Sequence, residues 1–220
     1  MEYLLIRSKR KTVSLQVDGI GKLIVRAPLR ASKASIQEIV KSKQRWIAKV
    51  SSQINQRIVL SLPTKLEEKL PLPYLGKSYD LHFWDAPFIA LKDKLHFPLA
   101  YQGEKEIQHL SKWYQEQARQ IIAQRASYWA NRIGAAFRTI RTGSARKRWG
   151  SCNSRQELRF SWYLIMLPME LMDYVIVHEL AHTKVMNHSR HFWKELEAIL
   201  PDARKYRQAL RQYSILSKSS

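Results

Sequence analysis

Apolar and polar residues alternate along the first part of the chain. The pattern has a period of two over residues 3–8 and 12–18, and it returns over residues 22–27. Such alternation predicts three half-buried strands. Apolar positions then recur every three or four residues, which predicts a helix that either Ser32 or Ser35 can cap.

The second half of the chain has longer helical patterns. Residues 74–99 predict several short strands, and Glu104 to about Arg132 reads as one long helix that Gly134 ends. Two further strands are predicted over residues 137–142 and 157–162. We therefore predict an α+β fold, with a β-rich N-terminal region and one helix over residues 1–100, and a second domain over residues 101–220.

Another helical pattern follows Pro168. Proline is tolerated in the first turn of a helix, and neither proline nor glycine interrupts residues 169–186. The apolar residues form a broad stripe, as expected for a helix that packs into a core. They are Leu171, Met172, Val175, Ile176 and Leu180.

Four of the seven histidines lie between residues 178 and 191. His178 and His182 are four residues apart, so a helix places both imidazoles on one face, about 5.4 Å apart along its axis. Two neutral imidazoles in this arrangement can bind one zinc ion, and Glu179 directly follows the first of them. This is the His-Glu-x-x-His pattern of zinc peptidases, in which the metal activates water and the glutamate is the general base.

A catalytic zinc takes three protein ligands and leaves one position for water. We predict His188 as the third ligand, six residues after His182. Asn187 tolerates the left-handed backbone that ends helices, which would turn His188 back towards the metal, and Ser189 can cap a following helix. The other candidates for the third ligand are His191, Glu195 and Glu197.

Characteristic short motifs surround the histidine pair. They are Arg148-Trp149-Gly150-Ser151-Cys152, the run from Leu158 to Leu164, the run from Tyr174 to His182, and Asn187-His188-Ser189 with Phe192-Trp193. From about residue 137 to 195 the chain resembles the YgjP-like metallopeptidases, within the wider SprT-like, gluzincin-related set of zinc proteases. The resemblance implies a zincin-like fold for residues 101–220. It also implies one zinc ion per chain, held by His178, His182 and His188, with Glu179 as the catalytic carboxylate.

These observations predict a zinc-dependent metallopeptidase that hydrolyses protein or peptide substrates. The strand near residues 157–162 can present its edge to an extended peptide, which gives affinity through backbone hydrogen bonds. A further donor should face the oxyanion that develops during hydrolysis. The candidates are His191, Tyr163 and Arg148.

Charge adds a candidate partner. The chain has 38 basic and 18 acidic residues, a formal net charge of +20, and such a surface attracts polyanions. Nucleic acid is therefore a candidate partner, and the protease can be a DNA-associated one of the SprT-like kind. Two other classes stay open: a zinc-stabilised basic nucleic-acid-binding protein without activity, and a metal-dependent hydrolase of non-peptide substrates.

Cys152 is the single cysteine, so no internal disulfide can form. No run of apolar residues approaches the length of a membrane-spanning helix, and the N-terminus lacks a basic leader followed by a cleavable apolar stretch. We predict a cytoplasmic protein with no membrane association. Cys152 is expected to be buried as a small apolar residue rather than to act as a ligand or redox switch.

Overall fold

The computed structural model describes residues 2–18 and 21–216. Contacts between Cα atoms divide the chain into two compact units, one formed by Met1–Val59 with Gln212–Ser220 and the other by Leu60–Arg211. The domain boundary predicted near residue 100 falls inside the second unit. Residues before this boundary are hydrogen-bonded to elements after it: the Leu75 amide donates to the Ile165 carbonyl over 2.7 Å, and the Tyr114 hydroxyl donates to the Pro73 carbonyl over 2.9 Å.

The smaller unit contains a three-stranded sheet, and the three predicted strands are present. β3 (Leu23–Pro28) lies in the centre, parallel to β1 (Leu4–Ser8) and antiparallel to β2 (Ser14–Val17). The helix predicted after them is in fact two helices, α1 (Lys33–Ser42) and α2 (Gln44–Asn55). The Ser32 side chain caps α1 by accepting a hydrogen bond from the Ser35 amide. The buried core consists of Leu23, Val25, Ala27, Ile36, Val40 and Ile47.

Short strands complete this part of the fold. β4 (Ile58–Leu60) pairs with β12 (Tyr213–Ile215), which lies near the end of the chain. The C-terminal residues therefore pair with a segment that comes more than 150 residues earlier in the sequence. Sequence periodicity did not predict this pairing, because each strand has only three residues.

The larger unit begins with a four-stranded sheet of strand order β5-β6-β8-β7. Its strands are β5 (Pro71–Tyr74), β6 (Lys77–Trp84), β7 (Ala90–Leu91) and β8 (Leu95–Pro98). A 3₁₀ turn, η1 (Leu99–Tyr101), leads to the long helix α3 (Glu106–Ile133). Gly134 ends α3 with a left-handed backbone at φ 59°, as its place in the sequence predicted.

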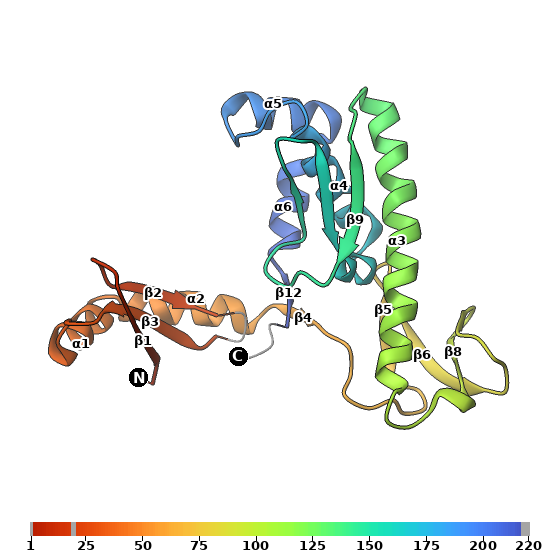
Figure 1. Cartoon of the computed structure of the whole chain (residues 1–220), viewed down its shortest axis with the longest axis horizontal. Helices are drawn as coiled ribbons and strands as arrows, with labels where there is room; N and C mark the ends of the chain where they lie inside the picture. The colour runs from red at the N-terminus through yellow and green to blue at the C-terminus, as the bar shows by residue number, and fades with distance from the viewer. Residues whose placement is uncertain (1, 19–20, 217–220) are drawn as a thin grey trace. The chain divides into compact units, whose positions relative to one another are not determined.

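A second sheet of three strands positions the candidate site. β9 (Thr139–Gly143) and β10 (Gly150–Cys152) flank β11 (Glu157–Ser161), which is parallel to β9 and antiparallel to β10. α3 packs along β9 (Figure 1). The prediction that β11 presents its edge to a substrate is wrong, because both of its edges are paired. Among residues 2–18 and 21–216, the unpaired edge next to the histidine helix belongs to β10.

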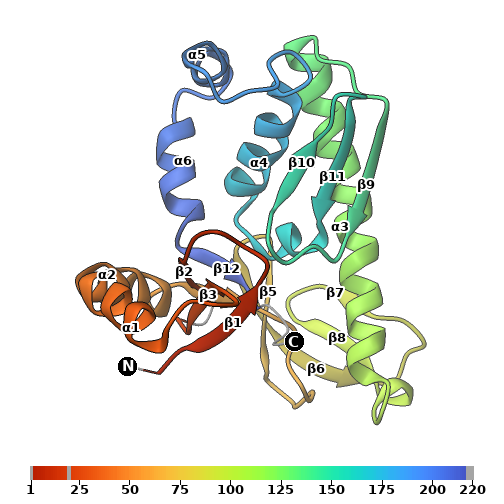
Figure 2. The same ribbon diagram turned by 60° about the vertical axis from the view of Figure 1, so that its left-hand side comes forward.

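The core of this unit lies between α3 and the second sheet. A 3₁₀ segment, η2 (Trp162–Met166), and α4 (Met169–Ala181) are almost wholly buried there. α4 packs against α3 on one side and against β10, α5 (Arg190–Ile199) and α6 (Ala203–Leu210) on the others (Figure 2). The fold is of the predicted α+β class. Within the described ranges, no helix has both the length and the apolar character needed to cross a bilayer.

Candidate metal centre

The helix that carries the histidine pair is shorter than predicted. α4 ends at Ala181 rather than at residue 186, and His182 is its C-cap residue. The Thr183 hydroxyl and the Thr183 amide both donate to the Leu180 carbonyl, over 2.7 and 3.0 Å. A threonine side chain that bonds to a carbonyl of the last turn competes with helix continuation, so the chain leaves the helix axis directly after the second histidine.

The return of the chain to the histidines does not use a left-handed Asn187. Asn187 is not among the described residues with positive φ. Its side-chain oxygen instead accepts a hydrogen bond from the Ser189 amide over 3.2 Å. Ser189 is the N-cap of α5, and its hydroxyl accepts from the Phe192 amide, as predicted. The Asn187 side-chain contact and the Ser189 cap therefore hold the loop that carries His188.

The three histidines come together at one point. The Nε2 atom of His188 lies 3.0 Å from Nε2 of His178 and 3.2 Å from Nε2 of His182. Ligand atoms bound about 2.0–2.1 Å from a tetrahedral zinc ion are roughly 3.3 Å apart, so this spacing fits one ion. Among the described residues, these three form the single group of histidine, cysteine and acidic side chains close enough to hold a metal.

The tautomer of His182 is fixed by the loop. Its Nδ1 atom lies 2.9 Å from the Val185 carbonyl, which can only accept, so Nδ1 carries the proton and Nε2 keeps a free lone pair. This is the usual outer contact of a metal-binding histidine. In contrast, Nδ1 of His178 is buried without a hydrogen-bond partner.

Phe192 of α5 supports all three imidazole rings. Its centroid lies 4.5 Å from that of His182 in a stacked arrangement, and 5.0 and 4.9 Å from those of His178 and His188. The Phe192 side chain is fully buried. Because aromatic rings pack in specific orientations, this contact holds the imidazoles in place without offering a competing ligand atom.

Desolvation favours the neutral, metal-binding form of His178 and His188. Desolvation, followed by the charges of His182, His188 and Arg207, lowers the pKa of His178 to about 3. Desolvation and the charges of His182 and Arg207 also lower the pKa of His188. Imidazoles with lowered pKa values are neutral at pH 7, and only the neutral form has a lone pair for a metal.

Glu179 lies on the side of α4 that faces β10. It is buried, and desolvation raises the pKa of its carboxyl group to about 7, although the Cys152 amide and Arg148 partly oppose this shift. The amide of Cys152 donates a hydrogen bond to the carboxylate. A carboxyl group with a pKa near neutrality is suited to accept and release protons at that pH.

The remaining predicted residues lie in different places. Arg148 is close enough to Glu179 to act on its pKa. Tyr163 is buried in η2, where its ring stacks on Trp162 with centroids 3.8 Å apart. His191 is exposed on α5 and is outside the histidine group. The carboxylate of Glu197 pairs with Arg204, and Glu195 is not part of the metal-binding group.

Three features of this site were missed by sequence reasoning. β10 was not predicted, because it is a three-residue strand within a basic loop. Gly150 of this strand lies against Glu179, and a Cβ atom added there would be 2.7 Å from the Glu179 Cγ atom. Arg207 of α6 stacks on the Trp193 ring, 4.6 Å from its centroid, and acts electrostatically on two of the histidines.

Cys152 is half-buried, and burial followed by the Glu179 charge raises the pKa of its thiol to about 11. The thiol is therefore protonated at pH 7 and is a poor ligand or nucleophile. Its sulfur donates to the Asn153 carbonyl, and Cys152 is outside the metal-binding group. Its backbone amide, rather than its side chain, contacts the candidate site.

The α+β fold and the three converging imidazoles define a protein with a candidate metal centre. Comparison with known families identifies its kind: the sequence model of the YgjP-like metallopeptidase domain matches residues 11–213, and the chain belongs to this family. It is thus a member of a metallopeptidase family, as the motifs around the histidines predicted. A comparison with curated proteins gives no match.

Two solved structures are similar to part of the chain. One is the metallopeptidase zymogen abylysin of Pyrococcus abyssi, at 20% identity and a TM-score of 0.38, covering 43% of this chain and 99% of abylysin. The other is the metallopeptidase zymogen jannalysin of Methanocaldococcus jannaschii, at 20% identity and a TM-score of 0.37, covering 41% of this chain and 94% of jannalysin.

Proposed function

We propose that this protein is a zinc-dependent endopeptidase or peptidase, with His178, His182 and His188 as the metal ligands and Glu179 as the general base. The observation that carries the proposal is the convergence of three imidazole Nε2 atoms beside a buried carboxylate. The donor set suits zinc, which prefers histidine nitrogen in catalytic sites with three protein ligands.

Bound zinc would supply Lewis acidity, which polarises a carbonyl and lowers the pKa of water from 15.7 to about 7. Glu179 accepts the proton of the attacking water and later delivers it to the leaving amine. The Cys152 amide holds the Glu179 carboxylate in position by its hydrogen bond. The charge of Arg148 acts on the pKa of Glu179, and the charge of Arg207 acts on that of His178. We assign to these two arginines the stabilisation of the developing oxyanion.

The open edge of β10 supports an extended peptide as substrate. Trp149 accepts from the Ser161 amide over 2.8 Å, and the Asn153 amide donates to Glu157 over 3.3 Å, so the odd-numbered residues of this segment bond to β11. In an antiparallel pair the intervening residues point the other way. The backbone groups of Gly150 therefore face the open edge, where a substrate strand can pair beside Glu179.

Metal content and hydrolysis of a peptide library test this proposal together. We expect one zinc per chain in the wild type. Glu179→Gln should retain zinc and lose hydrolysis, because it keeps the shape of the side chain but cannot take up a proton. His188→Ala should lose most of the zinc, whereas the matched variant His191→Ala should keep it. Turnover by the Glu179→Gln protein, or full zinc occupancy of the His188→Ala protein, would contradict the assigned roles.

Nucleic acid is a second candidate partner, favoured by the charge of the smaller unit. α1, α2 and the residue between them carry five exposed basic side chains, against one acidic residue, Glu38. The basic residues are Lys33, Lys41, Lys43, Arg45 and Lys49. Binding through such a surface depends strongly on salt, since it releases condensed counterions. Stimulation of proteolysis by DNA would place the enzyme with DNA-associated proteases.

A further inference from the structure

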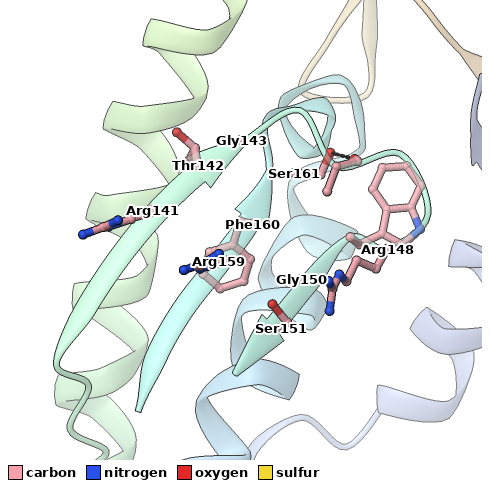
Figure 3. Close-up of a pocket in the computed structure, with 11 residues that line it drawn as sticks. Arg141, Thr142, Gly143, Arg148, Gly150, Ser151, Arg159, Phe160 and Ser161 are labelled. Atoms are coloured by element: carbon pink, nitrogen blue, oxygen red, sulfur yellow. Dashed lines mark hydrogen bonds between the residues drawn. The ribbon is translucent and has the colours of Figure 1, made fainter. Parts of the chain in front are cut away.

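A basic pocket lies beside β10. It has a volume of about 300 Å³ and is lined by residues of all three strands of the second sheet and of the loop between β9 and β10. Arg141 of β9 and Arg159 of β11 are direct neighbours in the sheet register, and Ser151 of β10 is the next in the same row. Figure 3 shows Arg141 and Arg159 projecting from neighbouring strands, and Arg148 next to Gly150 and Ser151.

The row of Ser151, Arg159 and Arg141 lies on one face of the sheet, and the Gly150 position faces the other. Residues directly opposite in register share a face, and successive residues of a strand alternate between faces. A Cβ atom added at Gly150 would point towards the Glu179 side chain. Arg159 is exposed between the buried residues Leu158 and Phe160. The two arginines are therefore on the face opposite to that occupied by Glu179.

The positive charge of this pocket is not neutralised within the described parts of the chain. The ion pairs among those residues do not include Arg141, Arg148 or Arg159. The charge of Arg159 helps to lower the pKa of Glu157, and the charge of Arg148 acts in the same direction on the pKa of Glu179. Neither carboxylate forms an ion pair with these arginines. Like charges directly opposite on neighbouring strands destabilise a sheet, and a bound anion would relieve this repulsion.

We propose that this pocket binds the acidic side chain of a peptide substrate. The proposal rests on the proposed peptidase function. A peptide strand paired with β10 places the side chain opposite Gly150 on the Glu179 face, and the adjacent side chain on the arginine face. A carboxylate at that adjacent position reaches guanidinium groups, which bind carboxylates with two parallel hydrogen bonds. The volume is at the lower limit of ligand pockets and suits one side chain rather than a large ligand.

Binding to an inactive protein tests the pocket separately from catalysis. The zinc-loaded Glu179→Gln protein would be titrated with fluorescent octapeptides that contain glutamine at every position except one, which is glutamate. We expect one position at which glutamate improves the dissociation constant by about tenfold or more, since hydrogen bonds to charged groups contribute about 1.5–3 kcal/mol. In the wild type, kcat/KM for cleavage should prefer glutamate at the same position.

Variants of the arginines test whether the pocket causes the preference for glutamate. Arg141→Gln together with Arg159→Gln should reduce the preference for glutamate to less than about threefold, which is below the contribution of one charged hydrogen bond. Both side chains are exposed, so the substitutions leave the core intact. Arg155→Gln removes one positive charge from the turn between β10 and β11, outside the pocket, and should keep the preference. The thermal unfolding of Arg155→Gln and of the double variant should match that of the wild type.

The outcomes separate the two proposals. Cleavage of the peptides without any preference for glutamate would overturn the pocket assignment and leave the peptidase. A preference in binding that the double variant removes, with no cleavage by the wild type, would support the pocket and overturn the peptidase. Binding of inorganic phosphate to the arginines without any preference among the peptides would show that the pocket binds a small anion. This result would overturn the proposal that it binds an acidic side chain.

Discussion

Gly150→Ala should displace Glu179, the proposed general base, without touching the three histidines proposed as metal ligands. The added Cβ atom would lie 2.7 Å from Cγ, 2.9 Å from Oε1 and 3.1 Å from the carboxyl carbon of Glu179. Carbon atoms in contact prefer about 3.5–4.0 Å, so the Glu179 side chain has to move by roughly 1 Å. Glu179 is only 8% exposed, and its side chain has little free space for this movement.

The expected effect on catalysis follows from this displacement. A catalytic group moved by 1 Å costs about 10²-fold in rate, which corresponds to about 2.7 kcal/mol in the activation barrier. Overpacking should also lower the free energy of unfolding by about 1–3 kcal/mol. We therefore expect kcat of Gly150→Ala to fall about 10²-fold in a peptide cleavage assay, with zinc content unchanged.

Two further variants distinguish positioning of Glu179 from general damage. Gly143→Ala is the matched control, because Gly143 belongs to the same sheet and a Cβ there would meet nothing within 4 Å. A double-mutant cycle with Glu179→Ala, measured by urea unfolding, should show coupling, since alanine has no atom at the Cγ position of the clash. A zinc-loaded Gly150→Ala protein with kcat within threefold of the wild type would refute the reasoning.

Other parts of the structure give further predictions. Phe192→Ala removes the ring that contacts all three histidines and should lower both zinc affinity and stability, the latter by about 3–5 kcal/mol, as measured by metal titration and urea unfolding. Asp173→Asn breaks the ion pair that joins α4 to Arg125 of α3; because Arg125 is partly exposed, we expect a loss of about 1–3 kcal/mol in urea unfolding, and an unchanged midpoint would show that the pair contributes nothing. Arg207→Gln should lower kcat more than it changes KM if this cation stabilises the oxyanion, and a change in KM alone would assign it to substrate binding. DNA affinity should fall steeply between 50 and 200 mM salt, and a salt-independent affinity would exclude the basic surface of α1 and α2 as its cause.

The sequence by itself determined many of the local elements and the histidines that form the candidate site. Period-two and helical patterns predicted the strands of the smaller unit and the long helix α3, because these segments bury one face each. The spacing of His178 and His182 predicted that both side chains share one face of a helix, and Ser189 predicted the start of α5. These predictions depend only on residues within one or two helical turns of one another.

The tertiary structure decided what depends on contacts between distant residues. The position of β11 in the centre of its sheet and of β10 at the edge is set by strand pairing, which no single segment encodes. Residues before and after position 100 likewise belong to one unit because of contacts such as the hydrogen bond between Leu75 and Ile165. Gly150 of the short strand β10 shows no periodic signal, yet it lies against Glu179 because folding packs this strand on α4. Local patterns indicate which face of an element is buried. The element that packs against this face depends on the packing of the whole unit.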